Sequence, residues 1–174
     1  VSLGAAQATV TNLDFSAFDG QEDALRKDGV RIFNGKSASI DLEPEYIAVS
    51  ANGKQALVTL QEANAVALLD LVTQKFTKIV PLGLKTYEGL LTDFSDKDSG
   101  YRPVSDKPVF GMYMPDAVSA FSVKGRTYFA IANEGDDRDD FMAGGEKARL
   151  STLVLDPVKF PNAAAWQASG ALGR

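Results

Sequence analysis

The sequence contains neither cysteine nor histidine. Disulfides, thiol nucleophiles and Ser-His-Asp triads are therefore excluded, and most zinc, haem and iron–sulfur sites lose the ligands they need. We expect no zinc, haem or nucleotide cofactor. Any bound metal would be a hard cation held by oxygen atoms, as calcium and magnesium are. The missing cysteine gives no evidence for an oxidising compartment and none against one.

Long apolar runs are missing as well. No run approaches the roughly 18 consecutive apolar residues of a membrane-spanning helix, so we predict no membrane insertion. Val1–Val10 lacks the basic flank and apolar stretch of an intact signal peptide, while a signal that has already been removed stays compatible with the sequence.

Positive charge is in the minority. The chain has 18 basic and 23 acidic residues, a net charge of -5, and its basic residues are scattered along the sequence. Because nucleic acid binding needs a basic face, we predict no nucleic acid partner and a surface that suits cations. A hydrophobic content of 45% in 174 residues is enough for a core, and we predict a single domain over residues 1–174.

What is present is a β-hairpin pattern that occurs twice. Each copy opens on a proline followed by an acidic residue, and its second strand ends at a glutamate. The first copy covers residues 44–64 with a turn at Asn52-Gly53, and the second covers residues 115–136 with a turn at residues 124–126. An antiparallel hairpin brings its open ends together, so Glu45 should lie near Glu62, and Asp116 near Glu134.

These two acidic corners predict a calcium site if neighbouring repeats bring them together. Calcium takes about 6 to 8 oxygen ligands, which carboxylates and amides supply. The candidate metal ligands are Glu45, Glu62, Asn64, Asp116, Glu134 and Asp136. The alternative is structural: each glutamate accepts hydrogen bonds from backbone amides or pairs with Arg138 or Lys54, as a device that fixes the repeat.

Two other acidic segments have the same two interpretations. Asp93, Asp96 and Asp98 approach a calcium loop but lack the distant glutamate of an EF-hand. Residues 133–140 hold five carboxylates around Arg138 directly after a predicted strand, a position where binding residues often occur. Ser50, Thr59 and Ser119 are poor nucleophile candidates, because no activating base is evident.

Strand patterns outnumber helix patterns. Four short strands are predicted at residues 46–50, 55–60, 66–71 and 76–80, a unit with the size of one propeller blade. We also predict a helical turn at residues 21–27, a strand pair at residues 30–33 and 37–42, and a strand at residues 150–156.

The predicted fold is all-β: a β-propeller fragment of about three to four blades, each of four antiparallel strands, with long inserted loops at residues 84–108 and 136–149. Three to four blades are fewer than most closed propellers contain, so the chain is expected to belong to a longer protein. Because an open arc leaves strand edges unpaired, we predict an edge-to-edge homodimer of the fragment.

Several segments carry a family resemblance. Residues 42–50, LEPEYIAVS, and 58–65, VTLQEANA, resemble the N-terminal propeller of the choice-of-anchor I family, and further matches follow in the same order at residues 79–83, 95–98, 111–116 and 132–136. The family consists of exported bacterial proteins, often labelled alkaline-phosphatase-like, that are related to animal mesenchyme-specific cell surface glycoproteins. The hairpin repeat is also similar to lactonase-like and surface-layer propellers.

The resemblance implies an extracellular, cell-surface or periplasmic location and a surface that is suited to calcium. We also expect other domains of the full-length chain as partners. The function it favours is a non-catalytic binding or structural module that holds calcium. The alternative is part of a calcium-dependent, alkaline-phosphatase-like phosphoesterase, and lactone hydrolysis rests on fold analogy alone. The sequence identifies no catalytic residue.

Overall fold

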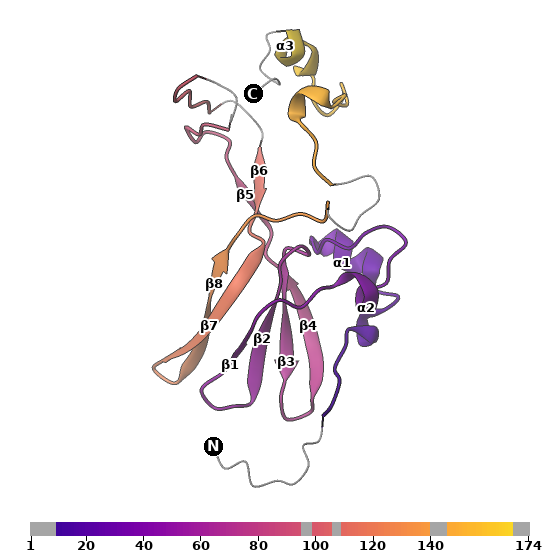
Figure 1. Ribbon diagram of the computed structural model, residues 1–174, viewed down its shortest axis with the longest axis vertical. Coiled ribbons are helices and arrows are strands. Elements are labelled where there is room, and N and C mark those ends of the chain that lie inside the picture. The colour runs from indigo at the N-terminus through magenta and orange to yellow at the C-terminus, as the bar shows by residue number, and fades with distance from the viewer. Residues whose placement is uncertain (1–9, 95–98, 106–108, 140–145, 169–174) are drawn as a thin grey trace. The chain divides into compact units, whose positions relative to one another are not determined.

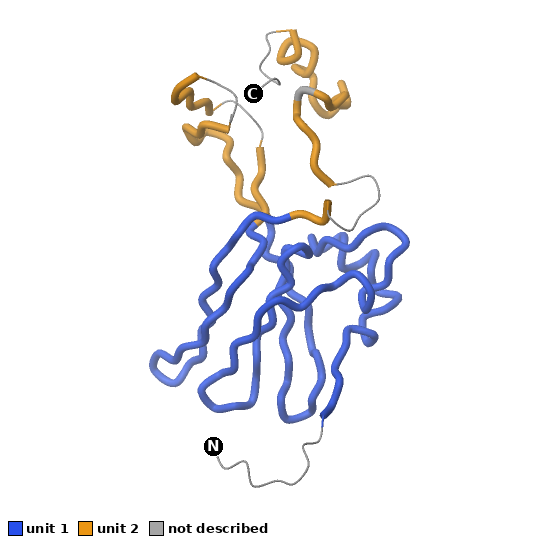
Figure 2. Tube along the Cα trace, viewed as in Figure 1, with its two compact units in different colours: residues 1–83, 113–136 blue, residues 84–112, 137–174 orange. Residues whose placement is uncertain are grey.

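The computed structural model describes residues 10–94, 99–105, 109–139 and 146–168. The chain divides into two compact units: unit 1 is residues 1–83 and 113–136, and unit 2 is residues 84–112 and 137–174 (Figure 2). Each unit is described by itself. The single domain expected over residues 1–174 stays a prediction.

Unit 1 is built on a four-stranded antiparallel sheet, ordered β1-β2-β3-β4 (Figure 1). Its strands are β1 (Ile47–Val49), β2 (Gln55–Leu60), β3 (Ala65–Asp70) and β4 (Lys75–Pro81). All four predicted strands are confirmed. Asp70 ends β3 because its carboxylate accepts the N–H groups of Val72 and Thr73, both at 2.8 Å, which fixes the turn into β4 and lowers the pKa of Asp70.

Both faces of this sheet are covered, which explains why β2 and β3 are buried along almost their whole length. One face packs on the segment that holds η1 (Ser16–Phe18), α1 (Glu22–Asp28) and α2 (Ala38–Asp41). The buried residues of this core are Phe15, Val30, Ile32, Ala38, Leu42, Val58, Leu60, Ala63, Ala65, Ala67 and Ile79. The predicted helical turn at residues 21–27 is confirmed as α1.

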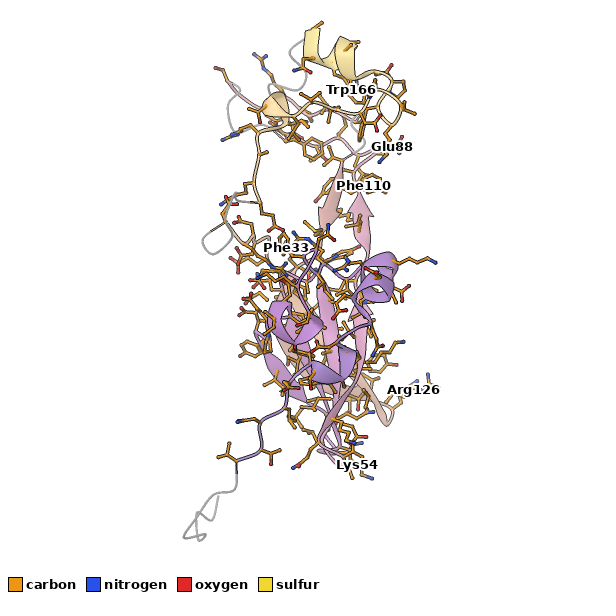
Figure 3. All side chains as sticks on the ribbon, turned by 90° about the vertical axis from the view of Figure 1, so that its right-hand side faces the viewer. Phe33, Lys54, Glu88, Phe110, Arg126 and Trp166 are labelled. Atoms are coloured by element: carbon orange, nitrogen blue, oxygen red, sulfur yellow. The ribbon has the colours of Figure 1, made fainter. Side chains whose placement is uncertain are left out.

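The other face packs against the second predicted hairpin, which is also confirmed. It consists of β7 (Pro115–Val123) and β8 (Arg126–Asn133), joined by Lys124 and Gly125 at φ +50° and +76°. Two successive positive φ values give a tight turn whose twist matches that of the strands. Val118 from β7 is buried here together with Leu57 and Val66 of the sheet. Lys54 and Arg126, at two of the hairpin turns, lie at the same end of unit 1 (Figure 3).

The strand pair predicted at residues 30–33 and 37–42 is wrong. Val30 and Ile32 are buried as the alternation requires, but the backbone of this segment bonds elsewhere: Arg31 N–H donates to the Ala63 carbonyl at 2.9 Å, and Phe33 N–H donates to Asp41 Oδ2 at 3.0 Å. Residues 38–41 form the single turn α2. Tertiary contacts with the sheet therefore replace the pairing that the local pattern favours.

Unit 2 has little regular structure in its described residues. β5 (Leu84–Thr86) pairs antiparallel with β6 (Phe110–Met112), a bridge joins Thr92 to Val104, and η2 (Leu150–Thr152) and α3 (Ala163–Ala168) follow. The strand predicted at residues 150–156 is wrong, because Thr152 N–H and Oγ1 both donate to the Arg149 carbonyl and close a 3-10 turn. None of the helices in the described residues has the length and hydropathy of a membrane span.

The all-β prediction is confirmed to the extent that the regular structure of the described residues is mostly antiparallel strand, with little helix. The described residues form one sheet of four strands and two sheets of two strands, without a closed ring. A propeller and its number of blades therefore remain predictions.

One side chain joins the elements of unit 1. Asn64, 1% exposed, ends the turn between β2 and β3 at φ +50°. Its Oδ1 accepts the N–H groups of Tyr113 and Met114 at 2.9 and 3.0 Å, and its Nδ2 donates to the Gly83 carbonyl at 2.8 Å. Its backbone carbonyl accepts Leu82 N–H at 3.0 Å. Asn64 therefore fixes the start of β7 against the sheet.

Replacing Asn64 should destabilise unit 1. In Asn64→Ala the three side-chain hydrogen bonds are lost and buried backbone groups stay unpaired, so the free energy of unfolding should fall by about 3 kcal/mol. Gln74, which is exposed and also has positive φ at +55°, supplies the control: Gln74→Ala should change that free energy by less than about 0.5 kcal/mol. Chemical denaturation measures both. If Asn64→Ala lowered the free energy of unfolding no more than Gln74→Ala does, Asn64 would not hold the start of β7 against the sheet.

Candidate metal site

The open ends of the two hairpins carry the predicted acidic residues. Glu45 precedes β1, and its N–H donates to the Thr59 carbonyl at 3.0 Å. Glu62 lies in the turn between β2 and β3, Asp116 lies at a register shift in β7, and Asp136 follows β8. Four carboxylates from four separate segments of unit 1 are thus placed at the ends of paired strands.

Thr59, which lies within β2 near these carboxylates in the sequence, connects the two hairpins through hydrogen bonds. This fully buried hydroxyl accepts Tyr46 N–H at 2.9 Å and donates to the Asp116 carbonyl at 2.8 Å, so it ties the irregular start of β7 to β2. Gln61, also buried, donates from Nε2 to the Glu134 carbonyl at 3.1 Å. Sequence reasoning did not find these two positioning residues, because neither a threonine nor a glutamine within a strand pattern signals its distant partner.

The negative charges at this end of unit 1 act on Glu45. The pKa of Glu45 is raised above its ordinary value, first by desolvation and then by the negative charges of Glu62, Asp116 and Asp136. This confirms that Glu45 lies near Glu62. It also shows that Asp116 and Asp136, from the second hairpin, contribute to the same negative field. We call Glu45, Glu62, Asp116 and Asp136 the acidic cluster.

Glu62 is the buried member of the acidic cluster. Its side chain belongs to a residue that is 5% exposed, and its Oε2 has no hydrogen-bond partner among the described residues. The Glu62 backbone carbonyl is held from the other side by Arg31 Nη1 at 2.7 Å. A buried carboxylate oxygen without a donor costs free energy unless a cation or a donor reaches it.

Two of the predicted ligands do not belong to the acidic cluster. Both ends of the Asn64 amide form hydrogen bonds with backbone groups, so this side chain holds the start of β7 against the sheet. Glu134 is exposed and is not among the charges that raise the pKa of Glu45. Within the described residues, no three acidic side chains are already close enough to hold a metal ion together, so the acidic cluster is a convergence of charge rather than a closed coordination shell.

The acidic segment after β8 has a structural role in unit 2. Lys147 Nζ lies 2.9 Å from Asp137 Oδ2 and 3.4 Å from Asp139 Oδ2, and Asp139 Oδ1 accepts Lys147 N–H at 3.0 Å. Arg138 N–H donates to Glu146 Oε2 at 2.9 Å. The pKa of Asp137 is lowered, first by the Asp139 N–H and then by Lys147. These contacts favour the structural interpretation of this segment.

The other acidic loop is described only in part. Asp93 Oδ2 accepts Arg102 N–H at 3.0 Å, whereas Asp96 and Asp98 lie outside the described residues. Beside Glu45, an open hollow of about 230 Å³ has an almost wholly apolar lining. Its lining residues are Leu13, Pro44, Glu45, Tyr46, Ile47, Val58, Leu69 and Phe76. This hollow offers space for an aliphatic group, not for an ion.

The raised pKa of Glu45 predicts that removing its charge stabilises the fold, and that this stabilisation depends on pH. The folded state binds the Glu45 proton more tightly than the unfolded state does, so the fold loses stability as the pH rises above the ordinary value of 4.5 and through the raised pKa. In chelator, Glu45→Gln should therefore have a higher Tm than the wild type at pH 7 and an equal Tm at pH 4. Glu88→Gln, at an exposed carboxylate of unit 2, is the control. A lower Tm for Glu45→Gln at pH 7 would contradict the crowding of these charges.

Comparison with known proteins gives one family. The family model of the choice-of-anchor I domain matches residues 1–174, the whole of this sequence. A search of curated proteins finds no match. The family indicates a surface-associated or extracellular module.

Proposed function

Since this chain belongs to the choice-of-anchor I family, we propose that it is an exported, surface-associated module without catalytic activity of its own, which binds calcium at the acidic cluster. The observation that carries the calcium proposal is the buried Glu62 carboxylate, whose Oε2 has no donor among the described residues. The charge of Glu62, together with those of Asp116 and Asp136, also contributes to the raised pKa of Glu45, after desolvation.

The physical argument concerns crowded negative charge. Like charges that crowd one another cost free energy, and desolvation together with the charges of Glu62, Asp116 and Asp136 raises the pKa of Glu45. A divalent cation offsets this cost, and the available ligand atoms are all carboxylate or carbonyl oxygens. Such ligands suit calcium, which accepts several oxygen atoms in flexible geometry, better than a transition metal, which prefers nitrogen or sulfur.

A cation at this position would have a structural effect. Glu45 and Glu62 come from the first hairpin and its following turn, whereas Asp116 and Asp136 come from the second hairpin. Binding would therefore tie β7 and β8 to the four-stranded sheet. We propose further that this sheet and the β7–β8 hairpin are successive blades of a propeller, with other domains of the full-length chain as partners.

Calorimetric titration with calcium tests the proposal. We expect chelator-treated protein to bind calcium saturably, and Glu62→Gln to weaken binding about tenfold or more, because one charged ligand is lost. Glu88→Gln should bind as the wild type does, since Glu88 is an exposed carboxylate of unit 2 outside the acidic cluster. No saturable binding by the wild type, or equal binding by the wild type and Glu62→Gln, would contradict calcium binding at the acidic cluster.

One further assay distinguishes the phosphoesterase alternative from this proposal. A non-catalytic module should leave a generic phosphomonoester unhydrolysed in the presence of saturating calcium. If the wild type hydrolysed the phosphomonoester in a calcium-dependent way and Glu62→Gln abolished this hydrolysis, the result would support the phosphoesterase and contradict a non-catalytic module.

A further inference from the structure

The sequence contains the tripeptide Asn-Gly-Lys twice, at residues 34–36 and 52–54. In both copies the asparagine and the glycine are exposed. An asparagine that precedes glycine is prone to lose its side-chain ammonia, because no side chain on the glycine shields its backbone nitrogen. Residue types and solvent access are therefore the same at the two sites, and the hydrogen bonds of the two turns make the difference.

In the first copy the hydrogen bond that closes the turn does not involve the glycine N–H. Lys36 N–H donates to the Phe33 carbonyl at 3.1 Å, and Gly35 has a φ of +79°. Asn34 and Gly35 are thus the two central residues of a β-turn. Among the described residues, neither the Asn34 side chain nor the Gly35 N–H has a hydrogen-bond partner.

In the second copy the glycine N–H itself closes the turn. Gly53 N–H donates to the Ser50 carbonyl at 2.8 Å, so the turn is shifted by one residue relative to the first copy. The Asn52 amide is fixed as well, because its Oδ1 accepts Ser50 Oγ at 2.8 Å and Lys54 N–H at 3.0 Å. The glycine nitrogen and the asparagine amide must break these hydrogen bonds before they can approach each other.

We propose that Asn34 is a site of spontaneous deamidation and isoaspartate formation, and that Asn52 is protected from this reaction. The Gly35 nitrogen gives its proton to water and attacks Asn34 Cγ. The bond between Cγ and Nδ2 then breaks, and ammonia leaves with a proton taken from water. A water molecule opens the resulting succinimide ring: cleavage at Cγ gives aspartate, and cleavage at the main-chain carbonyl carbon gives isoaspartate. The reaction needs no oxidant or reductant.

The modified chain should stay folded. The Asn34 side chain makes no hydrogen bond within the described part of the chain, so its conversion to a carboxylate breaks none. Isoaspartate also inserts a carbon atom into the main chain inside the turn, which should cost the hydrogen bond from Lys36 to Phe33. The buried Ile32 before the turn and α2 after it are held by other contacts with unit 1. Modified protein should therefore accumulate.

Peptide mapping by mass spectrometry tests the proposal in the wild-type chain. Trypsin places the two sites on separate peptides, residues 32–36 and 37–54. After incubation of the folded protein at mildly alkaline pH in chelator, the product at residue 34 should form about tenfold or more faster than the product at residue 52, because the second site must first break its hydrogen bonds. In urea, which unfolds both turns, the two sites should react at similar rates.

Two variants separate the contributions of the two turns. Asn34→Gln should abolish the product at residue 34, because glutamine closes its larger ring far more slowly. Ser50→Ala removes the hydroxyl group that Asn52 Oδ1 accepts. It should speed up the reaction at residue 52 and leave the rate at residue 34 unchanged.

The remaining outcomes overturn the proposal. If residue 34 reacted no faster than residue 52 in the folded protein, the turn at Asn34 would not favour the reaction. If the difference persisted in urea, the preceding residues Phe33 and Ala51, and not the turns, would cause it. An unchanged rate at residue 52 in Ser50→Ala would show that the hydrogen bonds of Asn52 do not protect it. Because Asn34 lies outside the acidic cluster and chelator is present, none of these results depends on calcium binding.

Discussion

The arrangement of unit 1 depends on the amide of Asn64. Its two ends hold the Gly83 carbonyl after β4 and the N–H groups of Tyr113 and Met114 before β7, so a single buried side chain sets where the second hairpin begins. The positive φ of Asn64 belongs to the same constraint, because it directs the amide towards these groups from a tight turn, and asparagine tolerates this conformation better than most residues. With the start of β7 fixed, Thr59 reaches the Asp116 carbonyl and the two apolar faces meet.

The same constraint creates the acidic cluster. Packing β7 on the sheet adds the charges of Asp116 and Asp136 to that of Glu62 near Glu45, and desolvation followed by these charges raises the pKa of Glu45, which is a cost to the fold at neutral pH. A fold that keeps such a cost at one end of two hairpins either receives a compensating cation or loses stability there. The calcium proposal follows from this balance of charge, and the family indicates a surface-associated or extracellular module.

Local signals predicted most of unit 1 from the sequence. The strands and turns of both hairpins follow from alternation and turn residues, and the proximity of Glu45 to Glu62 follows from hairpin geometry. Two failures have one cause. Val30 and Ile32 alternate as in a strand, but Arg31 between them donates its N–H to the Ala63 carbonyl in the β2–β3 turn. Asn64 was expected to bind metal, although the partners of its Oδ1 are backbone N–H groups 49 and 50 positions away. A single sequence shows that such residues are polar or apolar but does not show which distant group they meet.

Amide hydrogen exchange, measured residue by residue, tests the central role of Asn64 most directly. The account predicts that the N–H groups of Tyr113 and Met114, which lie outside any strand, exchange slowly, since Asn64 Oδ1 accepts both of them and they open only when the start of β7 leaves the sheet. In Asn64→Gly, which keeps the backbone conformation and removes the amide, Tyr113 and Met114 should exchange rapidly. Rapid exchange of these two groups in the wild type, or unchanged protection in Asn64→Gly, would contradict it.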